Sequence, residues 1–157
     1  LFSDLGVGQI GMGVIMAGIQ IVLLLGALIG PWFVLKARHE RAALLTSQIA
    51  IGITIALTPA VGVLGSALFF FGLSELARGL FRPIKDAYLN DQITDRTQRA
   101  TLLSFESMSH HGGGMLGLLV SGLVAEQFGV FAAWSLSGAV LVASAVLLLR
   151  AHRRSAT

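Results

Sequence analysis

Five long apolar runs constrain the fold of this chain most strongly. They cover residues 7–35, 42–57, 60–79, 101–125 and 130–149 of a chain of 157 residues. A helix of about 20 predominantly apolar residues spans the hydrocarbon core of a bilayer. Charged residues make up only 12% of the chain, whereas soluble domains contain about 25%. The sequence therefore predicts an all-α membrane protein with five transmembrane helices.

Polar segments separate these runs and predict the turns. A charged turn at Lys36–Arg41 follows the first run, and the uncharged Thr58-Pro59 follows the second. A tight turn at Glu126–Gly129 joins the last two runs. The longest polar stretch, residues 81–100, is predicted to be a loop in water.

The basic residues indicate the orientation in the membrane. With five alternating spans, all 11 lie on one side of the membrane: Lys36, Arg38, Arg41, Arg78, Arg82, Lys85, Arg96, Arg99, Arg150, Arg153 and Arg154. The other side carries only the acids Asp4 and Glu126. Because cytoplasmic loops carry the excess of Lys and Arg, we expect the 81–100 loop and the C-terminus in the cytoplasm.

Other classes of protein fit this sequence poorly. The net charge is only +3, and the basic residues lie in short segments between apolar helices, so we expect no nucleic-acid partner. The chain has no cysteine, and Gly112-Gly113-Gly114 lies within a predicted helix rather than after a strand, unlike a nucleotide-binding loop. We therefore expect neither an enzyme nor a cofactor. The chain starts at Leu1, with no Met and no signal peptide, so we expect it to be part of a longer protein.

Short motifs along the chain point to one family. They are Arg82-Pro83, Tyr88-Leu89-Asn90, Arg99–Ser104, Gly122–Glu126 with Gly129, and Asp4–Gly11. Together they resemble the Major Facilitator Superfamily of secondary transporters over essentially the whole chain. One departure follows Gly30, where the family often carries an Asp and a second Gly before a basic cluster, and this chain keeps only the basic cluster.

The resemblance implies that residues 1–157 are helices 8 to 12 of a twelve-helix transporter. It implies alternating access around a small-molecule site at the interface with an N-terminal half that this sequence lacks. It also implies that the second and fifth spans face lipid. In agreement, ionisable residues within the membrane occur only in the third and fourth spans.

Three of these residues are candidates for proton coupling or substrate binding. Glu75 is expected about 9 Å from the cytoplasmic end of its helix, counted from Phe81. Its alternative role is an ion pair with Arg78, three residues on. Glu106 and His110 share a helix face and could exchange a proton near neutral pH. Alternatively, Glu106 caps its helix and His110 bonds across an interface.

Two further groups of residues have predicted roles. Asp95, Arg96 and Arg99 could form a cytoplasmic gate of ion pairs, or could simply set the topology. Gly113, Gly117 and Ser121 continue the face of Glu106 and His110 as a small-residue seam for helix packing. Glu106 with His110 and His111 is too incomplete a ligand set to predict a metal enzyme.

The sequence thus favours proton-coupled transport of a small molecule, with efflux of an amphipathic compound as the preferred use. The expected location is a bacterial inner membrane. The alternative is a non-transporting helical scaffold whose glycine seams bind other helices. A scaffold should tolerate Glu75→Gln and Glu106→Gln, whereas a proton-coupled carrier should lose gradient-driven transport.

Overall fold

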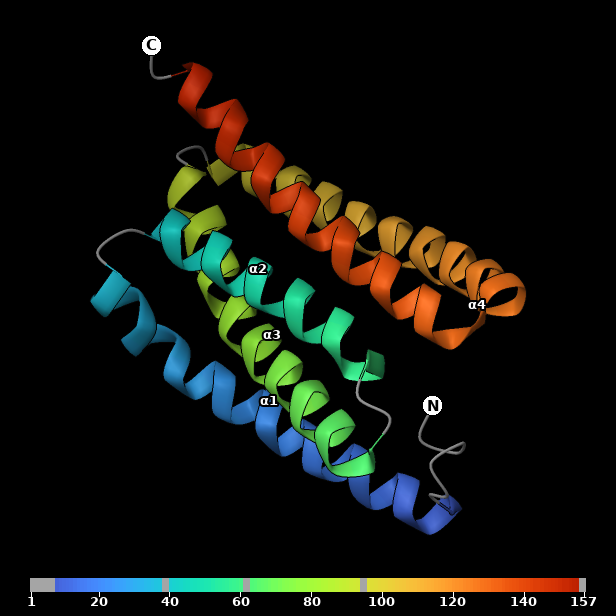
Figure 1. The fold of residues 1–157 in the computed structure, drawn as a ribbon. Helices are drawn as coiled ribbons and strands as arrows, with labels where there is room; N and C mark the ends of the chain where they lie inside the picture. Colours follow the sequence, from blue (N-terminus) through green and yellow to red (C-terminus); the bar gives the residue numbers. More distant parts are fainter. Residues whose placement is uncertain (1–7, 38–39, 61–62, 94–95, 156–157) are drawn as a thin grey trace.

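The structure of this chain, a computed structural model, consists of helices joined by short connections (Figure 1). It describes the backbone of residues 8–37, 40–60, 63–93 and 96–155, and the side chains of residues 8–33, 42–60, 63–91, 93 and 99–147. The elements are α1 (Gln9–Ala37), α2 (Glu40–Leu57), the 3₁₀ helix η1 (Thr58–Ala60), α3 (Leu64–Gln92) and α4 (Arg96–Ser155).

A break at Gly129 divides α4 into two antiparallel parts. Gly129 has φ 85° and ψ 164°, a backbone conformation that only glycine adopts readily. A straight helix of 60 residues would be about 90 Å long, whereas the hydrocarbon core is only about 30 Å thick. At Gly129 the chain instead turns back (Figure 1). The candidate span Arg99–Leu147 therefore covers nearly all of both expected C-terminal spans, and the turn predicted at Glu126–Gly129 is confirmed at Gly129.

The helices pack in the order α1, α3, α2 and the second part of α4 (Figure 1). Glycine permits the closest approach between α1 and α3. A β-carbon added at Gly26 would lie 3.0 Å from Gly79 Cα and 3.1 Å from the Leu76 carbonyl carbon. Close approach of backbones at small residues is the usual way in which membrane helices associate.

A second glycine pair brings α2 against α4. A β-carbon at Gly52 would lie 2.8 Å from the Gly138 carbonyl oxygen, and one at Gly138 would lie 2.9 Å from Ala56 N. One turn before Gly52, Gln48 Nε2 donates a hydrogen bond to Ser144 Oγ at 2.6 Å. This contact ties α2 to α4 by a polar bond within an otherwise apolar interface.

The loop predicted for residues 81–100 is wrong for most of its length. Residues 81–92 continue α3, and α4 begins at Arg96. The packing of α1 explains the difference. Gly30 leaves room for the ring of Pro83, since a β-carbon there would lie 2.9 Å from Pro83 Cγ, and the adjacent Ile84 is only 1% exposed. Packing against α1 favours a helix over a loop in this polar segment, and the backbone hydrogen bonds then form within the helix.

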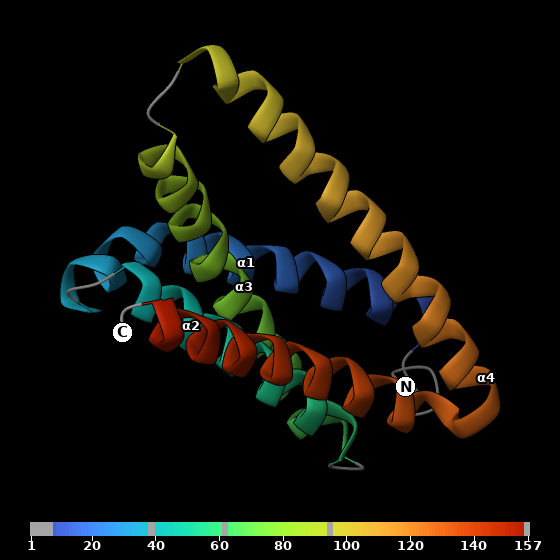
Figure 2. The ribbon, with the colours of Figure 1, turned by 90° about the horizontal axis from the view of Figure 1, so that it is seen from above.

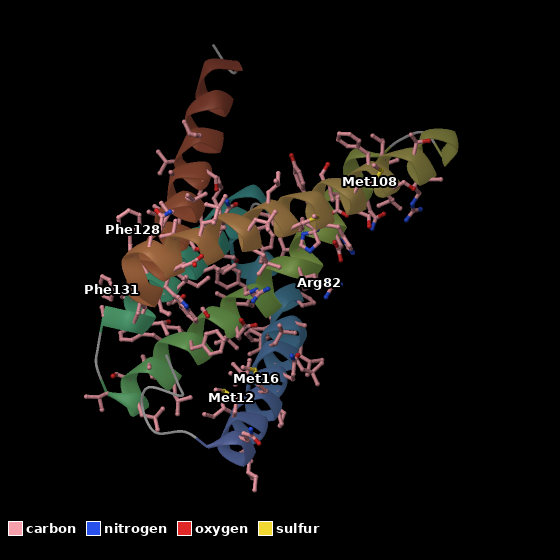
Figure 3. All side chains as sticks on the ribbon, turned by 90° about the vertical axis from the view of Figure 1, so that its right-hand side faces the viewer. Met12, Met16, Arg82, Met108, Phe128 and Phe131 are labelled. Atoms are coloured by element: carbon pink, nitrogen blue, oxygen red, sulfur yellow. The ribbon has the colours of Figure 1, made fainter. Side chains whose placement is uncertain are left out.

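The first part of α4 diverges from the other helices (Figure 2). Apolar side chains project from it and from neighbouring helices, including Met108, Phe128, Phe131 and Met16 (Figure 3). Their exposed fractions are 73%, 71%, 56% and 46%, respectively. Apolar surface on this scale suits contact with lipid or with other transmembrane helices.

Candidate functional site

A cavity of about 460 Å³ lies between α3 and the two parts of α4, with one residue of α2. In the described part of the chain, no Cα of α3 comes within 8 Å of a Cα of α4, so side chains line the space between them. The lining residues are Ile55, Phe71, Glu75, Arg78, Leu118, Ser121, Gly122, Ala125, Val130, Ala133, Trp134 and Ser137. The cavity is therefore mostly apolar, with one carboxylate, one guanidinium and two hydroxyls.

An ion pair forms the charged part of this cavity. Arg78 Nη1 donates a hydrogen bond to Glu75 Oε1 at 2.8 Å, one turn along α3. The Glu75 side chain is 7% exposed, whereas that of Arg78 is 56% exposed. The alternative considered for Glu75, a pair with Arg78, is thus observed, and the pair lines a cavity. A buried carboxylate that holds its counter-ion can change partners when it takes up a proton.

Glu75 lies much farther from the C-terminal end of its helix than the sequence indicated. The expected 9 Å assumed that the helix ends at Phe81, but α3 continues to Gln92. Counted from Leu64, Glu75 lies about 16 Å along the helix axis, roughly half the thickness of a hydrocarbon core. Counted from Gln92, it lies about 26 Å along the axis. The carboxylate is therefore central in α3.

Aromatic and hydroxyl groups from α4 complete the wall. The rings of Phe71 and Trp134 meet edge to face with centroids 5.5 Å apart. Ser121 and Ser137 place their Oγ atoms 3.3 Å apart across the two parts of α4. Sequence reasoning missed Trp134 as a site residue. It lies four residues from Val130, near the expected end of a span, where tryptophan usually marks the membrane interface.

The structure pairs Glu106 with Lys85 rather than with His110. Lys85 Nζ donates a hydrogen bond to Glu106 Oε1, and Lys85 also lies 3.8 Å from Asp86. Lys85 reaches Glu106 only because α3 continues as a helix beyond Phe81. The pair therefore ties the end of α3 to the first part of α4. The exchange of a proton between Glu106 and His110 stays a prediction.

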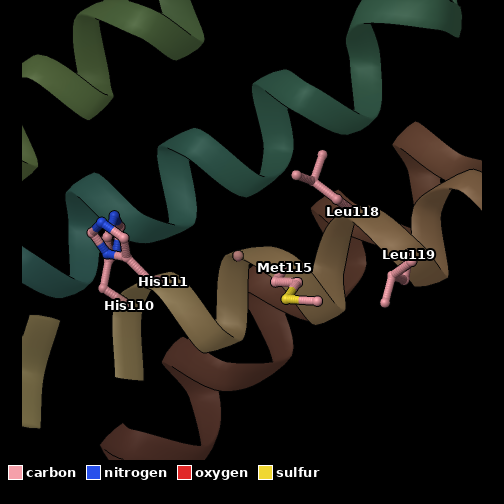
Figure 4. Close-up of a pocket in the computed structure, with 6 residues that line it drawn as sticks. His110, His111, Met115, Leu118 and Leu119 are labelled. Carbon is pink, nitrogen blue, oxygen red and sulfur yellow. The ribbon is translucent and has the colours of Figure 1, made fainter. Parts of the chain in front are cut away.

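His110 and His111 lie on an open face of α4 (Figure 4). Their ring centroids are 5.6 Å apart, and they border a surface depression of about 560 Å³ with Gly114, Met115, Leu118 and Leu119. Every lining residue belongs to the first part of α4. The depression is therefore one side of a helix and not an enclosed site.

The remaining predicted residues do not gather at the cavity, apart from Ser121. Arg99 Nη2 donates a hydrogen bond to Asn90 Oδ1 at 2.7 Å, which spans the connection between α3 and α4. Asp95 and the side chain of Arg96 lie outside the described residues, so the proposed gate is not tested. A β-carbon at Gly113 or Gly117 would meet nothing within 4 Å. Gly113 and Gly117 are thus uncovered within the described chain, whereas Ser121 meets Ser137. The packing role of the seam stays a prediction.

Among the described side chains, no group of three or more His, Asp or Glu residues is placed to hold a metal ion. Each described buried polar side-chain atom has a hydrogen-bond partner. The chemistry that the cavity offers is therefore that of its ion pair and its aromatic wall.

Comparison with known families identifies the kind of protein that carries this cavity. The sequence model of the Major Facilitator Superfamily matches residues 1–157. The chain belongs to the Major Facilitator Superfamily. Its fold is accordingly that of an all-α membrane transporter, and the superfamily comprises transporters of small molecules rather than enzymes. No curated protein and no solved structure matches the chain.

Proposed function

We propose that this chain is the C-terminal part of a twelve-helix secondary transporter that works by alternating access and couples transport to protons. The preferred use is export of a small amphipathic compound. The chain would supply helices 8 to 12, and an N-terminal half would complete the substrate path. The distribution of basic residues supports a cytoplasmic C-terminus, and a bacterial inner membrane is the proposed location.

One observation carries the proposal: Glu75 is buried at the middle of α3 and faces a cavity with Arg78 as its partner. Ionisable residues in transmembrane segments mark substrate or proton pathways by default. Protonation of Glu75 would remove the charge that holds Arg78. The pair is thus a group whose contacts change with proton binding, which is what coupling requires.

The pair of Lys85 and Glu106 has a different proposed role. Since α3 and α4 do not approach closely, this contact and the Arg99–Asn90 bond hold their ends together. Alternating access requires such contacts to break and re-form. We assign Lys85, Glu106 and Arg99 to the gate with Asp95 and Arg96, and keep His110 as a second proton-coupling candidate.

The test is gradient-driven transport by the full-length protein in proteoliposomes. A pH gradient is imposed, and accumulation of a panel of radiolabelled amphipathic compounds is compared with protein-free liposomes. Glu75→Gln should abolish gradient-driven accumulation while exchange of substrate without a gradient persists. Asp91→Asn is the matched control, because Asp91 is an exposed acid on the same helix that does not line the cavity.

Retention of gradient-driven transport by Glu75→Gln would refute the role of Glu75 in coupling. Absence of transport by the wild type across the panel, together with tolerance of Glu75→Gln and Glu106→Gln in folding and assembly, would instead favour the scaffold function.

A further inference from the structure

The cavity presents its positive charge more openly than its negative charge. Glu75 is 7% exposed as a side chain, and Arg78 is 56% exposed. Any cation that approached Glu75 would compete with the covalently tethered guanidinium 2.8 Å away. An anion can reach the guanidinium directly, because Arg78 is the more exposed group of the pair, and it competes there only with Glu75.

Arg78 also has donors to spare. A guanidinium carries five N–H donors, and Nη1 is the atom of Arg78 that binds Glu75. Arginine binds planar carboxylates and similar anions through two parallel hydrogen bonds, which adds geometric selectivity. A carboxylate or sulfonate could therefore bind Arg78 while Glu75 keeps the side chain in place, or could displace Glu75 from it.

The rest of the wall selects for an apolar body on the same molecule. Phe71 and Trp134 lie edge to face, and Leu118, Val130 and Ala133 extend the apolar lining. The volume of about 460 Å³ falls within the range of about 300–1,000 Å³ that is typical of small-molecule sites. A ligand with one charged end and a flat apolar end would satisfy both parts of this wall.

We propose that the cavity between α3 and α4 binds an amphipathic organic anion, with its carboxylate or sulfonate on Arg78 and its apolar body against Phe71 and Trp134. This inference rests on the proposed transport function and names the substrate class for it. It also makes Glu75 an internal competitor for Arg78, so removal of the Glu75 charge should tighten anion binding.

The experiment measures binding to the full-length protein in phosphatidylcholine nanodiscs by calorimetry, with empty discs subtracted. Three probes share one apolar body: 4-phenylbutyrate, 4-phenylbutanamide and 4-phenylbutylamine. The anion should bind most tightly. Arg78→Gln should weaken its binding by about tenfold to a hundredfold, the worth of a charged hydrogen bond, and leave the amide unchanged. Glu75→Gln should strengthen binding of the anion.

Two variants control this result. Arg82→Gln removes an exposed arginine of the same helix (Figure 3). Arg82 is not among the residues that line the cavity, so this change should leave binding unchanged. Arg78→Lys keeps the charge but not the two-pronged donor geometry, and it should give intermediate affinity. Helical circular dichroism and gel-filtration elution confirm that each variant is folded.

Several outcomes would overturn the inference: tightest binding of the amine, no binding of any probe, or unchanged anion binding in Arg78→Gln. An anionic lipid has the same chemistry as the proposed substrate. If phosphatidylglycerol in the disc competes with 4-phenylbutyrate through Arg78, the cavity is a lipid site and the substrate assignment fails.

The two proposals can fail separately. Gradient-driven transport of another compound without binding of these probes would leave the transporter and remove the anion site. Binding of the anion that depends on Arg78, in a protein that shows no gradient-driven transport, would do the reverse.

Discussion

Replacing Gly79 by alanine would add a methyl group at the closest point between α1 and α3. The new carbon would press on the carbonyl oxygen of Leu23, and it would lie 3.0 Å from both Ala27 N and Gly26 Cα. All three neighbours are backbone atoms of α1. Because none of them can rotate away, the helices must separate along the crossing.

The expected cost combines a steric loss with a conformational gain. Extra methyl groups in a packed interior cost about 1–3 kcal/mol, and alanine favours the helix over glycine by about 1 kcal/mol. Gly72→Ala is the matched control on the same helix, since a β-carbon there meets nothing within 4 Å. The conformational gain is common to both variants. They should therefore differ in stability by the steric part alone, about 1–3 kcal/mol.

The assay is reversible unfolding in mixed micelles with increasing dodecyl sulfate, followed by helical circular dichroism. Gly79→Ala should unfold at a lower dodecyl sulfate fraction than Gly72→Ala. Equal stability of the two variants would refute the close crossing of α1 and α3, and with it the packing that extends α3 beyond Phe81.

Two further predictions concern α4. Gly129→Ala should destabilise the protein by about 1–3 kcal/mol, since alanine at a φ of 85° is strained. Gly122→Ala should not destabilise it, because Gly122 is helical and a β-carbon there meets nothing within 4 Å. The same unfolding assay compares the two variants. Reversing one charge, as in Lys85→Glu or Glu106→Lys, should slow transport in the proteoliposome assay, and the double variant should recover it. Stability should change little, because both side chains are partly exposed and exposed ion pairs contribute little to folding. If the double variant does not recover transport, the ion pair of Lys85 and Glu106 is not a contact that transport requires between α3 and α4.

The all-α membrane fold could be predicted from the sequence because its signals are local. Apolar length fixes how many times the chain can cross a bilayer, and the two tight connections contain Pro59 and Gly129, residues that disrupt helix geometry. The structure has a 3₁₀ turn around the first and a break at the second. Both outcomes follow from backbone properties of single residues, which do not depend on what packs nearby.

The polar stretch after Phe81 was predicted wrongly because its conformation depends on another helix. Ile84 and Pro83 are isolated apolar residues among charges, a pattern typical of a loop. Pro83 packs against Gly30, more than fifty positions earlier, and the adjacent Ile84 is buried. The same extension places Lys85 beside Glu106, so one unpredicted packing contact also changed the partner of a candidate site residue.

One part of the candidate site could be predicted from local sequence, and the other part depends on the fold. The pairing of Glu75 with Arg78 could be predicted, since residues three apart on a helix are neighbours. The cavity that they face could not, because its other wall comes from Trp134 and Ser121, which the break at Gly129 brings together from two separate spans. An ion pair on a lipid-facing surface would be a structural contact. The same pair beside an aromatic cavity is a group that a charged ligand can reach. An anion site therefore depends on the fold of α4 as much as on Arg78 itself.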